Sequence, residues 1–181
     1  MNTDLSPCNL FTPEAFEAHL AKLDAPAWFI DLKRRHWQDF TTLPMPTRQM
    51  ERWRFTKLSQ LRLDGFAPVN TAPADSAERL IQHLELSEDA AARVGFVDNQ
   101  LVLRGTDLPT GVEVLTLPEA LKAHEGYLRD FFNVRAAMLG MDKFFALHMA
   151  FLNEGMYIRV PRGVALERPI EVHYLSRQPG T

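Results

Sequence analysis

The fold of this chain is decided by one stretch, residues 142–175, which reads DKFFALHMAFLNEGMYIRVPRGVALERPIEVHYL. Its first part is apolar on most sides of a helix, so it predicts a helix that other elements cover on most sides. Gly155 is expected to cap the C-terminal end of that helix. Two runs of alternating residues follow, 157–160 and 169–175, and this alternation is the pattern of β-strands.

The two strands need a larger β-structure than they can form by themselves. The sequence PRG (161–163) predicts a turn between them, and Pro169 is tolerated only at the start or the edge of a strand. We interpret them as the first rung of a stacked β-structure that the preceding helix covers. The partner of the second strand is then expected beyond Thr181, so that the chain would be a fragment. Its open edge predicts self-association with another copy.

The residues before this stretch predict mainly helices. Thr12 precedes a proline and a glutamate, which is a favourable helix start. A second helix is expected after Pro26, a short third one capped by Thr47, and another over 77–85. The second helix should place Trp28, Phe29, Leu32, His36 and Phe40 near one face, and Lys33, Arg34 and Arg35 mostly on the other.

A small αβ segment separates the helical parts. The dipeptide at 98–99 lies between two short β-prone runs and predicts a hairpin, and VEVLTL (112–117) predicts a third strand. Pro118 opens a helical stretch that reaches about Asn153. Because strands and helices are segregated along the chain, the fold class is α+β. We expect three parts: a helical region over 1–70, an αβ insert with helices over 71–141, and a capping helix with the first β-rung over 142–181.

Composition narrows the classes of function. Of 181 residues, 46% are hydrophobic and 24% charged, as in an ordinary folded protein, and the net charge of −3 predicts neither a nucleic-acid nor a membrane-surface partner. No apolar run approaches the roughly 20 residues that span a bilayer. Cys8 is the only cysteine, so one chain contains no internal disulfide and no cysteine-based zinc or iron–sulfur motif. These features predict a cytoplasmic protein.

No catalytic, cofactor-binding or metal-binding residue is predicted. Cys8 is interpreted as an incidental thiol rather than a sulfur acceptor or iron ligand. His148 is expected to be a packed, hydrogen-bonded histidine rather than a metal ligand. His173 and Glu171 share a strand face, where a two-ligand metal site is the alternative to an ordinary solvated face. The sequence has no G-x-S-x-G, H-E-x-x-H or phosphate-binding glycine motif.

The segment RQMERWRFTK (48–57) interleaves basic and aromatic residues, which superficially suits nucleic acid. The interpretation that we favour is structural. Trp53 and Phe55 are expected to be buried against neighbouring helices, and Arg54 to pair with a carboxylate or with capping carbonyls.

Two stretches resemble a known family. PMPTRQMERWRFTKL (44–58) resembles the P-x-PT…E-x-WRYT-x-L signature near the N-terminus of SufD, a family of the SUF iron–sulfur cluster assembly machinery, and 142–174 resembles the entry into the β-helix of SufD and its paralogue SufB. Phe55 stands where tyrosine is usual, and His148 where asparagine is usual. The motif residues, expected to be structural, are Pro46, Thr47, Glu51, Trp53, Arg54, Phe55, Thr56, Phe151, Gly155, Pro161, Gly163 and Pro169.

The resemblance implies the N-terminal part of a SufD-like protein. Its fold would be a helical region with a small αβ insert, followed by the first turn of a right-handed parallel β-helix. It would be a non-catalytic scaffold that contacts SufB-like and SufC-like (ATPase) subunits through its missing C-terminal part. No cofactor is expected in this chain, since the iron–sulfur cluster belongs to the full complex. The alternatives are a β-helix carbohydrate-active enzyme and a stand-alone protein-binding module.

Overall fold

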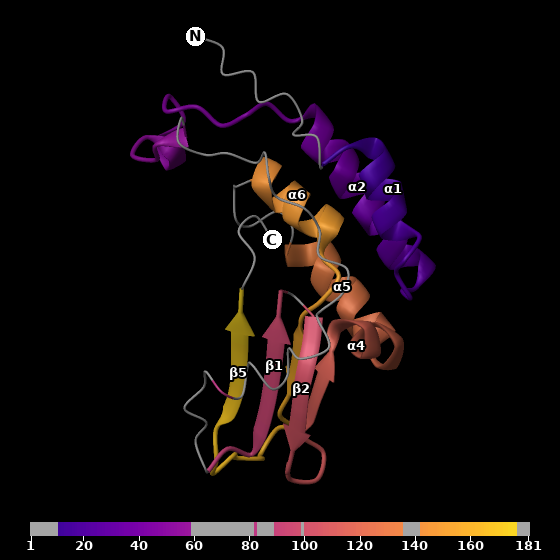
Figure 1. The fold of residues 1–181 in the computed structure, drawn as a ribbon, viewed down its shortest axis with the longest axis vertical. Coiled ribbons are helices and arrows are strands. Elements are labelled where there is room, and N and C mark those ends of the chain that lie inside the picture. Colours follow the sequence, from indigo (N-terminus) through magenta and orange to yellow (C-terminus); the bar gives the residue numbers. More distant parts are fainter. Residues whose placement is uncertain (1–10, 59–81, 83–88, 99, 136–141, 177–181) are drawn as a thin grey trace. The chain divides into compact units, whose positions relative to one another are not determined.

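The protein is described here by a computed structural model (Figure 1). The described residues are 11–58, 82, 89–98, 100–135 and 142–176. Cys8 lies outside them, as does the helix expected over 77–85 apart from residue 82. The chain divides into two compact units: 1–67 with 121–153, and 68–120 with 154–181.

The core of the first unit is built from three helices: α1 (Pro13–Leu20), α2 (Ala27–Thr42) and α6 (Asp142–Phe151). The helix start predicted at Thr12 is confirmed, because its side chain accepts a hydrogen bond of 3.1 Å from the backbone N–H of Ala15. Proline at the first helical position loses no intrahelical bond there, so the local sequence is sufficient to begin α1.

Apolar side chains of the three helices meet in one cluster. Phe16, Leu20 and Ala150 are buried, and Trp37 and Phe151 pack against them. The rings of Phe16 and Trp37 are stacked with their centres 4.9 Å apart. The predicted inner face of α2 is confirmed by four buried side chains: Phe29, Leu32, His36 and Phe40.

Two further helices follow the third strand: α4 (Leu117–Ala123) and α5 (Glu125–Arg135). The start of α4 is fixed by a capping box. Glu119 accepts a hydrogen bond of 2.8 Å from the backbone N–H of Thr116, and Thr116 Oγ1 accepts one of 3.4 Å from the N–H of Glu119. The sequence analysis assigned this start to Pro118, but the cap that sets it lies two residues earlier.

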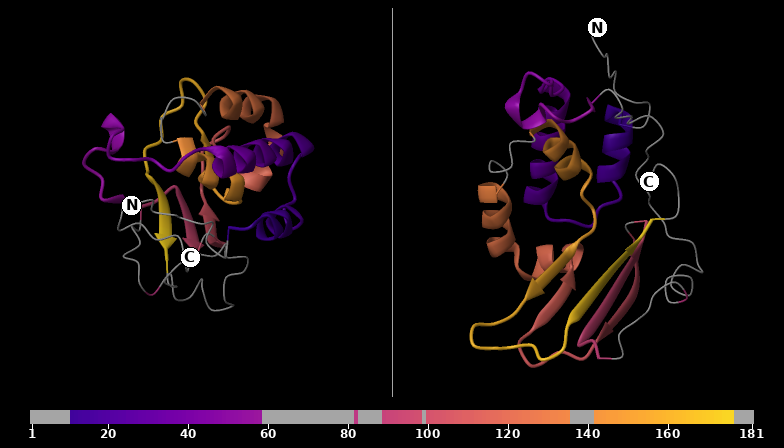
Figure 2. Two further views of the ribbon diagram at one scale, coloured as in Figure 1. Left: turned by 90° about the horizontal axis from the view of Figure 1, so that it is seen from above. Right: turned by 90° about the vertical axis from the view of Figure 1, so that its left-hand side faces the viewer.

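The second unit contains a three-stranded sheet with the order β2–β1–β5 (Figure 2). Its strands are β1 (Ala92–Val97), β2 (Gln100–Thr106) and β5 (Ile170–Leu175). The predicted hairpin is confirmed: β1 and β2 are antiparallel, and Asp98 takes a left-handed φ of 47° at the turn, which aspartate tolerates. β5 runs parallel to β1 on its other edge.

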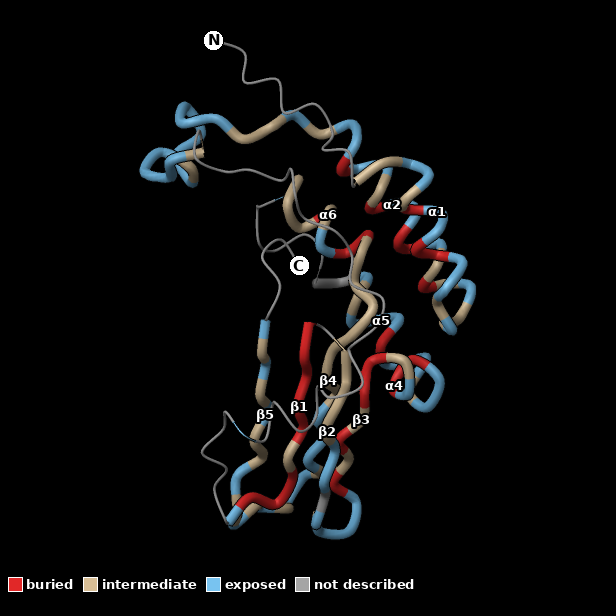
Figure 3. Tube along the Cα trace, in the orientation of Figure 1, coloured by how far each residue is buried: buried red, intermediate tan, exposed pale blue. Residues whose placement is uncertain are grey.

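A second, two-stranded sheet pairs β3 (Glu113–Thr116) with β4 (Met156–Arg159) in antiparallel register. The core of this unit joins both sheets, because Val94 and Phe96 of β1 cluster with Val114 of β3. Figure 3 shows β1 as the buried strand of its sheet, which follows from its place between two neighbours.

The structure corrects the expected partner of the second C-terminal strand. β5 pairs with β1, far earlier in the chain, rather than relying on a strand beyond Thr181. Only its other edge lacks a strand among the described residues. The expectation was wrong because parallel pairing joins strands that are distant in sequence. The local residue pattern of a strand does not show which distant strand it pairs with.

Gly155 is also misplaced by the sequence analysis. α6 ends at Phe151, and Gly155 lies just before β4, where its carbonyl oxygen accepts a hydrogen bond of 2.9 Å from Leu117 N–H. By contrast, the predicted turn at 161–163 is confirmed. Val164 N–H donates to the carbonyl of the turn's proline at 3.1 Å, and Gly163 has a φ of 83°, a conformation that favours glycine.

Helices and sheets are thus both present, as an α+β protein requires, but the units are not consecutive in sequence. The stretch that was expected to form one part, 142–181, gives its helix to the first unit and its strands to the second. The chain therefore leaves the second unit after β3 and returns to it after α6.

Candidate functional site

The two stretches that resemble SufD meet at a ring contact in the first unit. After α2, residues 44–50 run without regular structure into a short 3-10 helix, η1 (Glu51–Trp53). The ring of Trp53 lies 5.4 Å from that of Phe144 in α6. Trp53 is half-buried, so this contact anchors the segment to the helix.

Phe55 is 87% exposed, and the expectation that it is buried is therefore wrong. A 3-10 turn has about three residues, so side chains two positions apart point in different directions. When Trp53 faces α6, Phe55 faces away from it. Arg54 agrees better with expectation: its Nη1 lies 3.8 Å from Glu51 Oε1, although both side chains are largely exposed and the ion pair is weak.

Lys33 is fully buried in the first unit. Its Nζ donates hydrogen bonds to the carbonyl oxygens of Met149 (3.4 Å) and Ala150 (3.1 Å), near the C-terminal end of α6. Burial lowers the pKa of Lys33 to about 7, whereas the carbonyls and the negative end of the helix dipole favour the ammonium form. The prediction that Lys33 lies with Arg34 and Arg35 on the outer face of α2 is wrong for Lys33.

Lys143 makes the reverse contact, from α6 to the end of α2. Its Nζ donates to the carbonyl oxygens of Phe40 and Leu43, both at 2.6 Å, and lies 4.8 Å from the centre of the Phe40 ring. The last carbonyls of each helix are thus bound by a lysine of the other, as cations near a helix C-terminus should be. We call these two contacts the α2–α6 lysine pair.

This pair was not predicted from the sequence, although a signal for Lys33 is present. Lys33 follows Phe29 by four residues and precedes His36 by three, which places it on the same stripe as these buried side chains. A charged residue on an apolar stripe points to a buried partner. No comparable signal marks Lys143, because it stands beside Asp142 at the start of α6 rather than within an apolar stripe.

Histidines surround Lys33 in the first unit. His19 is buried, and its Nε2 has no hydrogen-bond partner among the described residues. Burial lowers the pKa of His19 to about 4, with the charges of Lys33 and Lys22 adding to the effect. Burial also lowers the pKa of His36, against the opposing charge of Asp39. These imidazoles are therefore neutral at pH 7 beside a buried amine.

The two histidines singled out from the sequence lie in different units. His148 is at the surface of α6 rather than packed in the core, and partial burial together with the charge of Lys33 lowers its pKa. His173 Nε2 lies 3.5 Å from Glu171 Oε2, whose carboxylate is also 3.5 Å from Arg93 Nε on β1. Within the described ranges, no group of three or more His, Cys, Asp or Glu side chains is placed to bind a metal.

Three further motif residues lie in packing or turn positions. Phe151 packs its ring edge-on against Phe16, with centres 5.8 Å apart. Pro161 accepts the turn hydrogen bond described above, and Pro169 accepts one of 2.8 Å from Ala91 N–H at the start of the β1–β5 pairing.

One pocket lies beside the turns that flank β2 and β5, and Ala91, Leu108 and Leu166 are part of its wall. Its charged side chains include Arg168 and Asp107, which form an ion pair with each other. Glu167 is the third charged residue of the wall, and nothing in the pocket assigns it a chemical role.

A model of the SufBD protein N-terminal region matches residues 10–172, nearly the whole chain. The chain belongs to the SufBD family. The chain is 22% identical over 182 aligned residues to "Iron-sulfur cluster assembly protein SufD" of Bacillus subtilis (strain 168), whose name supports the SufD side of this family. It is also 28% identical over 143 residues to "Protein ABCI7, chloroplastic" of Arabidopsis thaliana. The resemblance inferred from the two motifs is thereby confirmed.

This SufBD chain spans only part of these relatives. The alignments cover 93% and 76% of the chain, but 39% of the Bacillus protein and 28% of the Arabidopsis protein. Across the described part of the SufBD chain, none of the helices has the length and apolar character to cross a membrane.

Proposed function

We propose that this SufBD chain acts in iron–sulfur cluster assembly as the N-terminal part of a non-catalytic SUF subunit. The observation that carries the proposal is the family match over residues 10–172. The name of the Bacillus relative, an iron–sulfur cluster assembly protein, supplies the process. Among the motif residues, Trp53 and Phe151 pack against aromatic rings and Pro161 accepts a turn hydrogen bond, and such roles suit a scaffold.

We further propose that the second unit begins a right-handed parallel β-helix. The parallel pairing of β5 with β1 supports this idea, because stacked β-structures grow by adding parallel strands at an edge. β5 is the edge strand of its sheet among the described residues. In this proposal the next rung continues from β5, and the N-terminal part of the protein caps the β-helix.

The partners proposed are SufB-like and SufC-like subunits, bound through segments of the full-length protein that follow this region. ATP hydrolysis then belongs to the SufC-like ATPase, and the iron–sulfur cluster to the assembled complex. A cytoplasmic location is part of the same proposal. The alternatives, a β-helix carbohydrate-active enzyme and a stand-alone binding module, are less favoured because the family match accounts for both motif stretches.

Co-purification tests the proposal. The complete reading frame that encodes this region is expressed with a tag, together with the SufB-like and SufC-like proteins of the same genome. The expected result is a stable complex that contains all three proteins, whereas residues 1–181 alone do not retain the ATPase. A complete product that purifies without either partner, under conditions where those two bind each other, would contradict the assignment.

A further inference from the structure

We propose that residues 48–57, here called the basic segment, form a docking surface for an acidic protein segment that carries an apolar side chain. The inference rests on three properties of the basic segment: exposed apolar side chains, a fixed backbone and a concentrated positive charge. It does not depend on the proposed role in cluster assembly.

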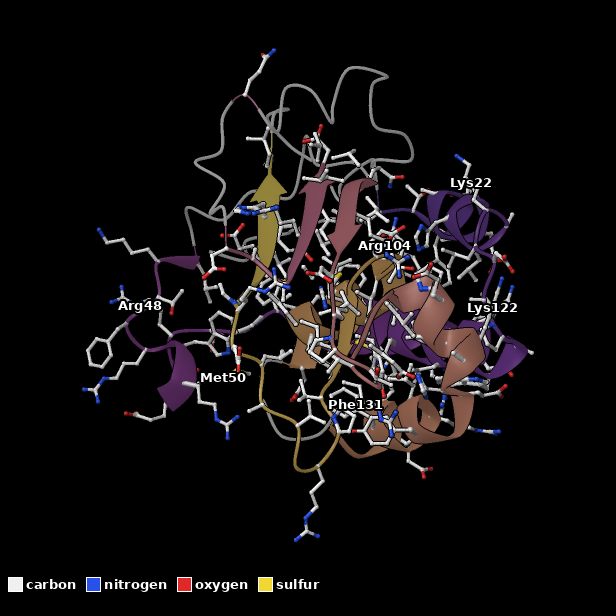
Figure 4. All side chains as sticks on the ribbon, turned by 90° about the horizontal axis from the view of Figure 1, so that it is seen from below. Lys22, Arg48, Met50, Arg104, Lys122 and Phe131 are labelled. Carbon is white, nitrogen blue, oxygen red and sulfur yellow. The ribbon has the colours of Figure 1, made fainter. Side chains whose placement is uncertain are left out.

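Two large apolar side chains of the basic segment face solvent. Phe55 is 87% exposed and Met50 is 43% exposed. The guanidinium carbon of Arg54 lies 5.5 Å from the centre of the Phe55 ring, so one face of the ring is covered by a cation. An aromatic ring and a methionine next to arginine are the residue types enriched at protein interfaces. Figure 4 shows Arg48 and Met50 on the segment that carries η1.

The backbone that presents these side chains is held by its own bonds. Met50 N–H donates to the Thr47 carbonyl at 3.0 Å, and Thr56 N–H donates to the Trp53 carbonyl at 3.0 Å. Arg48 Nε reaches the Arg54 carbonyl at 3.3 Å. Together with the ring contact between Trp53 and α6, these bonds fix the outward direction of Phe55. A preformed surface loses less conformational entropy on binding than a flexible one.

Charge identifies the chemistry of the occupant. The basic segment contains four basic residues and one acidic residue, a formal charge of +3, whereas the whole chain carries −3, so the remainder carries −6. Arg52 and Lys57 are exposed, and no ion pair within the described residues neutralises them. A partner segment rich in Asp and Glu would therefore be attracted to this surface specifically.

An acidic protein segment fits this surface better than nucleic acid does. The −6 charge of the remainder opposes a long polyanion such as nucleic acid, which would extend beyond the basic segment. A short acidic peptide places its charges over the arginines alone. Its apolar side chain would then cover Phe55 and Met50, which a phosphate backbone cannot do.

Fluorescence anisotropy with purified residues 1–181 tests the proposal. The probes are a labelled Asp/Glu-rich peptide with one central leucine, the same peptide with alanine in place of leucine, and a labelled single-stranded oligonucleotide of equal charge. The variants are Phe55→Ala and the double variant Arg52→Glu/Lys57→Glu. Their matched controls are Val160→Ala, at an apolar residue that is 42% exposed in the second unit, and Lys22→Glu at an exposed lysine of the first.

The leucine peptide is expected to bind the wild type, and this binding should weaken at high salt. Phe55→Ala and Arg52→Glu/Lys57→Glu should each weaken it by about tenfold or more. Both control variants should bind as wild type does, and circular dichroism should show all four folded. Equal binding by wild type and Phe55→Ala, no binding at all, or tighter binding of the oligonucleotide would each overturn the proposal. So would a dimer of the wild type that Phe55→Ala dissociates, since the occupant would then be a second copy. Each of these results is independent of the co-purification above, so the two proposals fail separately.

Discussion

At the scale of single residues, the burial of Lys33 should make the free energy of unfolding depend on pH. Its amine binds a proton up to pH 10.5 in the unfolded chain, its ordinary pKa, but only up to about pH 7 in the fold. Between these values the unfolded state holds more protons, so the free energy of unfolding must rise with pH. Burying the charged amine therefore lowers the free energy of unfolding by the full amount below pH 7. This penalty shrinks as the pH rises toward 10.5.

We therefore predict that Lys33→Met removes a pH dependence. Urea unfolding of the wild type should show a free energy that rises from pH 7 toward pH 10 by a few kcal/mol, on the order expected for such a shift in the pKa of Lys33. Lys33→Met should lose most of this rise, because it has no proton to release at position 33. A smaller rise should remain from Lys143, whose pKa burial also lowers. The exposed Lys22→Met control should keep the wild-type slope. A slope in Lys33→Met as steep as that of the wild type would show that another group produces it.

Trp53 in η1 and Phe55 just after it should differ in how much they stabilise the fold. Trp53→Ala loses a half-buried ring and its contact with Phe144, and should cost about 1 to 3 kcal/mol, less than a fully buried aromatic residue. Phe55→Ala should stay within about 0.5 kcal/mol of the wild type, as is usual for surface positions. Thermal unfolding of both variants measures the difference, and equal losses would mean that Phe55 packs in the fold.

Single residues were predicted well from the sequence where the cause is local. The helix start at Thr12 and the hairpin of β1 and β2 needed only their neighbours in the chain, and the structure agrees at both. The predictions that Lys33 is exposed and that Phe55 is buried were wrong for one shared reason. Whether a side chain is covered depends on which helix lies opposite, and the partners of Lys33 are more than a hundred residues away.

At the scale of elements, the three-stranded sheet predicts unequal protection of its strands. β1 has a partner on both edges, whereas β5 has one only on the β1 side among the described residues. Hydrogen exchange followed by mass spectrometry should therefore show slower exchange over Ala92–Val97 than over Ile170–Leu175 in dilute protein.

Self-association at the open edge remains a prediction that the same measurement checks. If copies pair through β5, exchange over this strand should slow as protein concentration rises, while exchange over β1 stays constant. Tyr174 strengthens the expectation, because it is 61% exposed although its ring stacks on Phe96 at 4.7 Å. Exchange over β5 that is as slow as over β1 at every dilution would show a partner already present on that edge.

At the scale of the whole molecule, we predict that the chain alone assembles no iron–sulfur cluster. Clusters are usually held by several thiolates, and this chain supplies Cys8 alone. Anaerobic reconstitution with iron and sulfide, followed by desalting, should leave both the wild type and Cys8→Ser colourless. A stoichiometric visible chromophore in the wild type that Cys8→Ser abolishes would make Cys8 a ligand, most simply between two copies.

The order of elements along the chain was largely predictable, but their assembly was not. The helices of 13–42, the hairpin, the third strand and the turn at 161–163 follow from periodicity and turn residues. The parallel pairing of β5 with β1 and the interleaved units do not, because each depends on contacts between segments that other elements separate. The motifs at 44–58 and 142–174 identified the family even so, because a family resemblance can be read from local residue patterns without knowing how the segments pair.

The α2–α6 lysine pair fixes how far α6 can slide along α2. Sliding α6 along α2 by one helical turn, about 5.4 Å, would pull both lysines off their carbonyls at once. Movement in either direction is opposed, because Lys33 holds the end of α6 and Lys143 holds the end of α2. The pair therefore sets the axial register of the helices, and with it the place where Phe144 meets Trp53.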